Sequence, residues 1–179
     1  RTEAQRLVAP IADIIRLSQL DEGDEMPRET VDLLTLSQEA ADDLKTAAAE
    51  KHIAIAVEGG SETIGGVRRL LYEVIYNLCD NAIRYNRPGG KVQIITACTR
   101  DGHCTLTVKD NGIGIPKEAQ TSVFERFYRV DKSRSKATGG TGLGLAIVKH
   151  IARIHGARIK LESQVDEGTT ITVTFPTAD

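Results

Sequence analysis

Three polar residues at helical spacing could hold a metal ion. Glu73, Asn77 and Asn81 recur at every fourth position of an apolar-periodic segment, so they share one face of a predicted helix, with Arg84 one turn beyond. Amide oxygens are hard, neutral ligands that suit Mg²⁺, which takes its remaining oxygens from water and phosphates. Taken alone, the same spacing also fits an ordinary solvated polar face.

A carboxylate and two nearby glycines come directly after an alternating strand. The segment reads Asp110-Asn111-Gly112-Ile113-Gly114-Ile115-Pro116. Its aspartate could accept a hydrogen bond from an exocyclic amine, and its glycines would let the backbone approach a flat ligand closely. The Asp-Asn-Gly tripeptide by itself is equally typical of a tight turn.

A second glycine-rich segment opens the next predicted helix, with the sequence Gly139-Gly140-Thr141-Gly142-Leu143-Gly144-Leu145. Glycines before a helix N-terminus present free N–H groups to a phosphate. The spacing differs from the Rossmann fingerprint, and the Gly90-Lys91 pair lacks the Walker A continuation. The HRD and DFG signatures of protein kinases are absent.

An aromatic and basic segment lies between the two glycine-rich ones, at 124–136. Phe124 and Phe127 could pin one end of a nucleotide lid whose basic residues reach toward phosphate, although a solvated basic loop is the alternative. Outside these segments the signals are weak. Cys98, His103 and Cys104 do not make a recognised zinc spacing, and the alternation favours packing of the cysteines in strands.

The elements that must position these residues follow from periodicity. We expect a helix over 1–20, an acidic linker, a strand at 29–33, helices at 37–50, 67–85 and 143–155, and strands at 52–57, 91–98, 104–109, 157–163 and 169–175. Paired strands with few helices predict an α+β fold, with the helices layered on one face of a mixed sheet.

Composition excludes several classes of protein. The chain has 179 residues and a formal net charge of −2, which argues against binding to nucleic acid through phosphate contacts. No apolar run is long enough to span a membrane. The three cysteines are an odd number without a C-x-x-C pair, so nothing indicates a disulfide scaffold. Because the chain opens at Arg1 without a leader pattern, we expect a fragment of a longer protein.

Taken together and in this order, the motifs resemble the ATP-binding catalytic domain of a bacterial sensor histidine kinase, in the superfamily of gyrase and Hsp90. The resembling segments are the N box (77–85), the G1 box (110–116), the F box (124–129), the G2 box (140–145) and a final Gly-Thr-Thr motif (168–170). The resemblance implies a two-layer α/β sandwich (the Bergerat fold), with about five mostly antiparallel strands covered on one face by three helices, plus an N-terminal helix. It implies three regions: 1–22 as the end of a dimerisation hairpin, 23–28 as a linker and 29–179 as the catalytic domain.

The resemblance also implies roles for individual residues. Asn77 and Asn81 would hold Mg²⁺ on the phosphates of ATP, with Glu73 acting on the water shell of the metal. The adenine would be bound by Asp110, Thr170 and Tyr85, with Gly112, Gly114 and Ile115 around it. The phosphates would lie against Gly140, Thr141, Gly142, Leu143, Gly144 and Leu145. Arg84, where lysine is usual, would pair with phosphate, and Arg129 would approach the γ-phosphate during transfer.

The family's acceptor histidine lies on the first hairpin helix, and none of His52, His103, His150 and His155 has its sequence context. We therefore expect the chain to bind ATP without phosphorylating itself. The resemblance implies a response regulator and the protein's own hairpin as partners, a homodimer in the intact protein, no nucleic acid, and a cytoplasmic domain of a membrane-anchored protein.

Three alternatives remain on the same fold. An ATP-hydrolysing clamp of the gyrase or Hsp90 type would use Glu73 as general base, but the F box speaks against it. A serine kinase of the anti-sigma-factor type would lack the apolar stripe at 7–15. A nucleotide sensor without activity would not need every metal and adenine position filled.

Overall fold

The fold is built on one five-stranded mixed sheet. The computed structural model describes residues 26–125 and 144–176. The sheet order is β2-β4-β5-β7-β6, in which β2 runs parallel to β4 and every other neighbour is antiparallel. The strands are β2 (Ala54–Gly59), β4 (Lys91–Cys98), β5 (Cys104–Asp110), β6 (Arg158–Gln164) and β7 (Gly168–Phe175). This confirms the predicted α+β class and its mostly antiparallel sheet.

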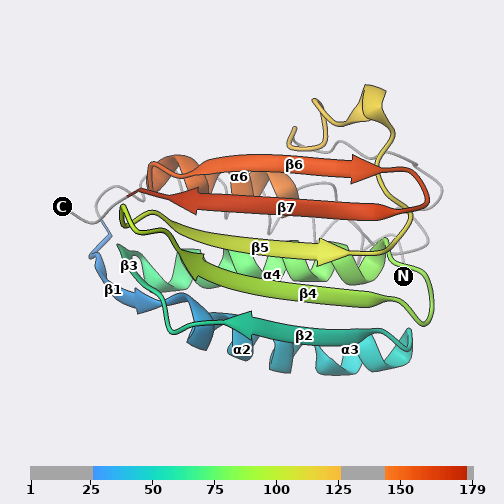
Figure 1. Ribbon diagram of the computed structural model, residues 1–179, viewed down its shortest axis with the longest axis horizontal. Coiled ribbons are helices and arrows are strands. Elements are labelled where there is room, and N and C mark those ends of the chain that lie inside the picture. The colour runs from blue at the N-terminus through green and yellow to red at the C-terminus, as the bar shows by residue number, and fades with distance from the viewer. Residues whose placement is uncertain (1–25, 126–143, 177–179) are drawn as a thin grey trace, which may run out of the picture.

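The helices lie together on one face of the sheet, as Figure 1 shows with the open face toward the viewer. They are α2 (Leu33–Asp43), the short α3 (Lys45–Glu50), α4 (Arg68–Arg84) and α6 (Gly144–Ile154). Apolar side chains at alternate positions of β4, β5 and β7 meet the apolar stripes of these helices. The largest fully buried side chains form the core: Leu33, Leu36, Leu70, Leu71, Ile75, Leu78, Ile94, Leu106, Ile147 and Ile151.

Two elements depart from the sequence-based expectation near the N-terminal side of the domain. The helix expected at 37–50 begins earlier and is interrupted at Leu44, giving α2 and α3. It begins early because the Asp32 carboxylate caps α2, accepting from the backbone N–H of Leu34 at 2.9 Å and also bonding Ser61 Oγ at 2.5 Å. The segment between the expected strand at 52–57 and the expected helix at 67–85 contains a further strand, β3 (Thr63–Gly66), which pairs with β1 (Glu29–Asp32) in a separate two-stranded sheet.

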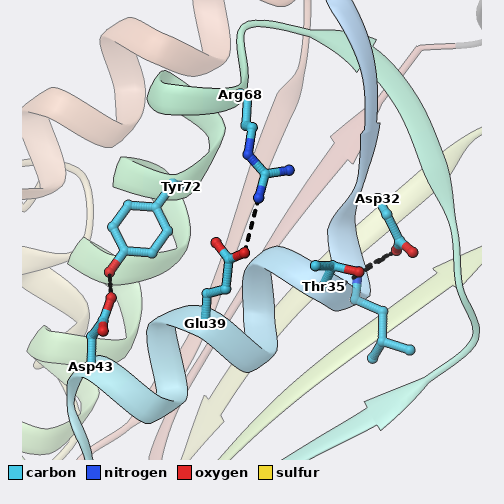
Figure 2. Close-up of polar contacts among 7 residues, drawn as sticks. Asp32, Thr35, Glu39, Asp43, Arg68 and Tyr72 are labelled. Carbon is cyan, nitrogen blue, oxygen red and sulfur yellow. Dashed lines mark hydrogen bonds and ion pairs between the residues drawn. The ribbon is translucent and has the colours of Figure 1, made fainter.

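Polar contacts fix α2 against the first turns of α4 (Figure 2). Arg68 donates to Glu39 at 2.9 Å, and the Tyr72 hydroxyl donates to the Asp43 carboxylate. Burial and the neighbouring Asp43 raise the pKa of Tyr72, so the phenol stays protonated. These contacts hold in place the helix that carries Asn77 and Asn81.

A short 3₁₀ helix, η2 (Lys117–Ala119), follows the loop after β5. No helix within residues 26–125 and 144–176 combines the length and the apolarity required to span a bilayer. The N-terminal helix expected over 1–20 lies outside the described residues, as does the region boundary at 22.

Candidate nucleotide site

The polar face of α4 carries the three residues expected to hold a metal. Glu73, Asn77 and Asn81 are all half-buried, while Val74, Ile75 and Leu78 on the opposite stripe are buried in the core. Asn77 donates from Nδ2 to the Glu73 carbonyl at 2.8 Å, which leaves its Oδ1 for another partner. One oxygen of the Glu73 carboxylate, Oε2, is buried. The helix therefore presents oxygen donors along one partly buried face.

The start of α6 lies against this face. A Cβ placed on Gly144 would be 3.5 Å from Asn77 Oδ1 and 3.8 Å from Asn81 Nδ2. The last glycine of the G2 box thus lies close to both asparagines, although 67 positions separate Asn77 from Gly144 in the sequence. This proximity brings the N-terminus of α6 to the face of α4 that carries the candidate metal ligands, and Leu145, half-buried, follows it.

Asp110 ends β5 in a half-buried position beside the C-terminus of α4. Its Oδ1 accepts from the backbone N–H of Gly112 at 2.9 Å and of Thr169 at 3.3 Å. Burial raises the pKa of Asp110 to about 6, against the opposing effect of these two hydrogen bonds. We expect a bound donor group to offset part of the desolvation cost of this carboxylate.

Close backbone approach explains the two glycines of the G1 box. A Cβ on Gly112 would lie 2.6 Å from the Tyr85 carbonyl oxygen, to which Ile113 N–H donates at 3.1 Å. Gly114 has φ +73°, and a Cβ there would lie 2.1 Å from the Gln164 carbonyl oxygen. The loop after β5 is therefore held between the end of α4 and the β6–β7 turn, and this contact fixes Tyr85 beside it.

A serine that sequence reasoning missed holds this loop to the sheet. Ser163 Oγ accepts from Ile115 N–H at 2.8 Å, donates to the Gly168 carbonyl at 2.9 Å and lies 2.8 Å from Thr169 Oγ1. Gln120 Nε2 spans the Ile115 and Ser163 carbonyls at 3.0 and 3.1 Å. Alternation in the strand at 157–163 could have placed Ser163 on the inner face, but no motif marked it.

The structure corrects the assignment of Thr170. Strand register pairs Asp110 with Thr169, and Thr169 lies on the same face as buried Ile171, Val173 and Phe175. Thr170 pairs with Lys109 and points to the opposite, open face of the sheet. The threonine beside the Asp110 carboxylate is Thr169, because strand side chains alternate between faces.

The Arg84 side chain is engaged within its own helix. Its Nε donates to Asp80 Oδ2 at 2.8 Å, an i,i+4 pair at the end of α4. The Lys51 ammonium donates to the carbonyls of Ile83 and Arg84 at 3.1 and 2.6 Å, which satisfies the C-terminus of that helix. Arg84 thus lies at the C-terminal end of α4, where Asp80 holds its side chain.

The remaining predicted site residues lie outside the described part of the chain. These are Arg129 of the F box and four residues of the G2 box, Gly140, Thr141, Gly142 and Leu143. Phe124, the first residue of the F box, is described and half-buried.

The cysteine prediction was wrong in one respect. Cys98 and Cys104 face each other across β4 and β5 and form a disulfide. Cys104 is buried, as expected from strand alternation, but sequence reasoning did not pair it with Cys98. Cys79, the third cysteine, is buried as a free thiol in α4.

Comparison with known proteins bears directly on this arrangement. Residues 66–179 match the family model described as "Histidine kinase-, DNA gyrase B-, and HSP90-like ATPase", which is more than half of the chain. The chain belongs to this family. Within it, the similarity is to the ATPase domain of sensor histidine kinases, as the relatives below show.

One curated relative is the sensor-like histidine kinase SenX3 of Mycolicibacterium smegmatis, 44% identical over 177 residues. The match covers 97% of this chain and 46% of that protein, so the chain spans less than half the length of the relative. Among solved structures, the mycobacterial sensor histidine kinase MprB matches with a TM-score of 0.74 and 28% identity, covering 84% of this chain and 97% of that one.

A second solved structure, full-length ShkA in complex with AMPPNP, matches with a TM-score of 0.83 and 26% identity, covering 99% of this chain and 38% of that one. These findings confirm the predicted family and fold. The chain is thus a histidine-kinase-type ATPase domain, similar to part of the sensor histidine kinases above.

Proposed function

We propose that residues 29–179 bind Mg²⁺-ATP and donate its γ-phosphoryl group to a histidine on the dimerisation hairpin, for relay to an aspartate of a response regulator. The contact of Gly144 with Asn77 and Asn81 carries this proposal, because it joins the phosphate-binding end of α6 to the metal-binding face of α4. Phosphoryl transfer needs positioned groups and neutralised phosphate charge more than covalent work by the protein.

Adenine recognition is the role we assign to Asp110. Its ionised carboxylate would accept from the exocyclic amine, while the N–H groups of Gly112 and Thr169 hold the carboxylate in place. Tyr85, half-buried at the end of α4, would lie along the base, with Ile115 and the glycine backbone of the G1 box around it. The backbone of Tyr85 packs so closely on Gly112 that no Cβ would fit there, which is consistent with this role.

The donor set on α4 fits Mg²⁺. Asn77 and Asn81 offer neutral amide oxygens on a partly buried face, and Glu73 supplies a carboxylate one turn earlier. We assign Asn81 and Asn77 as ligands and Glu73 to the hydration shell. Held by Asn77 and Asn81, Mg²⁺ would supply charge neutralisation for the phosphates. The residues of α4 orient the donor, while the backbone of the G2 box, 140–145, holds the phosphates.

Two arginines complete the proposed phosphate contacts. Arg84 would keep its Nε on Asp80 and offer the other guanidinium nitrogens to phosphate. Arg129 would approach the γ-phosphate during transfer, the F-box role implied by the resemblance.

The acceptor and the partners belong to the intact protein. We propose that residues 1–22 continue a hairpin that carries the acceptor histidine, that this hairpin makes the homodimer, and that a response regulator is the downstream partner. Because response regulators and ATP are intracellular, we place the domain on the cytoplasmic side of a protein anchored in the membrane.

Calorimetric titration of Mg²⁺-ATP into residues 1–179 tests the binding step. We expect a Kd in the micromolar to sub-millimolar range, and Asn81→Ala should remove its dependence on Mg²⁺. Gln93→Ala is the matched control, because it also deletes an amide but on the open sheet face, where it contacts Glu58. A folded wild type that binds no nucleotide would refute the proposal.

Transfer is tested with γ-labelled ATP. The chain alone should stay unlabelled, since none of its four histidines has the acceptor context, and label should appear on the hairpin of the intact protein added in trans. Steady release of ADP without the hairpin would instead favour the ATP-hydrolysing clamp, with Glu73 as general base.

A further inference from the structure

The end of the sheet remote from the nucleotide site gathers three metal-ligating side chains. Cys98 ends β4, Cys104 begins β5, and Glu62 comes from the segment between β2 and β3. One ligand atom from each lies within 4.8 Å of the other two. Cys104 is buried and the other two are half-buried, so the cluster is set into the structure and does not stand on an exposed loop.

The fold brings the two sulfurs together independently of the bond between them. Register places Cys98 directly opposite Cys104, with Cα atoms 4.0 Å apart. The next pair, Thr99 and His103, is bonded through Thr99 N–H at 2.8 Å, so the cysteines occupy a non-hydrogen-bonded pair, in which side chains are closest. Cys98 shares its face of β4 with Val92 and Ile94, and Cys104 shares its face of β5 with Leu106 and Val108. Both sulfurs therefore lie on the interior face of the sheet.

Glu62 is positioned by backbone contacts on both sides. Its carbonyl accepts from Leu33 N–H at 2.9 Å at the start of α2, and the neighbouring Thr63 carbonyl lies 3.9 Å from Cys104 Sγ. The carboxylate therefore reaches the sulfur pair from a segment that the fold holds in place. After reduction of the disulfide, two thiolates and a carboxylate from three segments would make a three-ligand set.

We propose that the dithiol form of this chain binds a thiophilic divalent ion, Zn²⁺, through Cys98, Cys104 and Glu62, with water as the fourth ligand. A dithiol reductant first breaks the S–S bond, giving two protein thiols and one oxidised reductant. Binding then releases one proton from each thiol. Two sulfurs bound to one tetrahedral zinc lie about 3.8 Å apart, a separation that opposed cysteines in a non-hydrogen-bonded pair can reach by side-chain rotation.

The disulfide and the metal are competing states of one site. ATP-containing compartments are reducing, so the dithiol is the state in which the proposed kinase domain would work; this consequence rests on the proposed function, whereas the metal site does not. The site is six residues of β5 away from Asp110, or about 20 Å along the strand. Zinc binding and ATP binding are therefore measurable separately.

The test is titration of the reduced chain, freed of reductant without oxygen, with Co²⁺ and then with Zn²⁺. We expect one equivalent of Co²⁺ to give thiolate-to-metal charge-transfer absorption in the near ultraviolet and tetrahedral d–d bands, both removed by one equivalent of Zn²⁺. Zinc should also protect two of the three thiols from a thiol reagent. The disulfide form, made with an oxidant, should bind neither ion.

Three variants decide which residues bind. Cys98→Ser should abolish the charge-transfer band, and Glu62→Gln, which keeps both thiols, should weaken Zn²⁺ binding at least tenfold. Cys79→Ser is the matched control, because burial raises the pKa of Cys79 to about 12 and the residue lies inside α4, so the metal titration should not change.

Unchanged far-ultraviolet circular dichroism is required of each variant. Glu62→Gln with wild-type zinc affinity, or a reduced wild type that takes up no stoichiometric metal, would overturn the proposal. ATP titration of the same samples should be unaffected by zinc, so failure of the metal site leaves the proposed kinase function intact, and the reverse also holds.

Discussion

The two ends of the sheet are fixed by different means. At the nucleotide end, β5 ends at Asp110 and β7 begins at Gly168. Backbone atoms there pack directly on backbone atoms, and the side-chain oxygens of Asp110 and Ser163 accept hydrogen bonds from backbone N–H groups. The other end, where β4 ends and β5 begins, is the hairpin end; its name refers to the β4–β5 hairpin and not to the dimerisation hairpin. Side chains meet there instead, in the Cys98–Cys104 pair and the Thr99–His103 turn. The nucleotide end therefore has no room for an added atom at its glycines. The hairpin end is mixed: a Cβ on Gly59 would lie 2.0 Å from the Thr96 carbonyl oxygen, whereas one on Gly156 would make only an ordinary contact with Pro176.

Gly168→Ala should give the largest effect. Gly168 has φ +124°, and a Cβ there would lie 2.1 Å from the Asp110 carbonyl oxygen, so strain and clash coincide. We expect the free energy of unfolding to fall by about 3 kcal/mol or more and ATP binding to be lost. Urea denaturation and calorimetry measure the two effects.

Gly156→Ala is the matched control from the hairpin end. Gly156 also has a positive φ, +65°, but its Cβ would meet only the Pro176 side chain, at 3.8 Å. Its cost should be about 1 kcal/mol, from the left-handed backbone alone, with ATP affinity unchanged. Equal losses at the two glycines would contradict the distinction between the two ends.

Asp110→Asn should separate affinity from stability. The amide would present a donor to the exocyclic amine of adenine, so ATP affinity should fall about 100-fold, or about 3 kcal/mol. The apo domain should instead become more stable at neutral pH. Burial raises the pKa of Asp110 from 3.8 to about 6, so the wild type loses stability as pH rises from about 4 to above 6, and the variant lacks this loss.

The gain above pH 7 should be about 1–3 kcal/mol, measured as the difference between variant and wild type in urea at pH 4 and 8. Asp101→Asn is the counterpart at the hairpin end, where hydrogen bonds from Thr99 and His103 lower the pKa of Asp101 to about 2. That carboxylate favours folding when ionised, so its replacement should reduce stability at neutral pH. A loss at both positions would contradict the desolvation of Asp110.

His155 should control how strongly acid reduces the folding stability of the domain. It is buried, accepting from Val67 N–H at 3.0 Å through Nε2 and contacting the Ile151 carbonyl at 2.9 Å through Nδ1, and burial lowers its pKa. A lowered histidine pKa gives stability that is present above pH 6.5 and is lost as pH falls, by at most about 1.4 kcal/mol per pH unit. His155→Gln should reduce this dependence of stability on pH. Thermal denaturation at pH values from 7.5 to 5 measures the change.

His103→Gln is the control, because it removes a half-buried histidine from the hairpin turn. The acid-induced loss should persist in that variant. If it disappears there, or persists in His155→Gln, another group carries the pH dependence.

Sequence alone predicted the family, the sheet and most of the strands, because periodicity and the four motifs agree. It did not predict the packing of α6 on α4, since no local pattern relates Gly144 to Asn77. It misplaced Thr170, because assigning a threonine to one face requires the register with Asp110, and register is a property of the paired strands. It did not find the Cys98–Cys104 pair for the same reason.

Ser163→Ala should give the smallest effect and is the sharpest test of how the nucleotide end is held. The hydroxyl bonds Ile115 N–H and the Gly168 carbonyl, so its loss leaves the G1 loop with the Gln120 and backbone contacts. We expect ATP affinity to fall about 3- to 10-fold, near 1 kcal/mol, with a faster dissociation rate. Thr105→Ala, which deletes a weak bond of 3.4 Å to Ala97 at the other end of β5, should leave affinity unchanged. Stopped-flow displacement of a fluorescent ATP analogue measures both, and a Ser163→Ala protein with wild-type dissociation would show that glycine packing alone positions the loop.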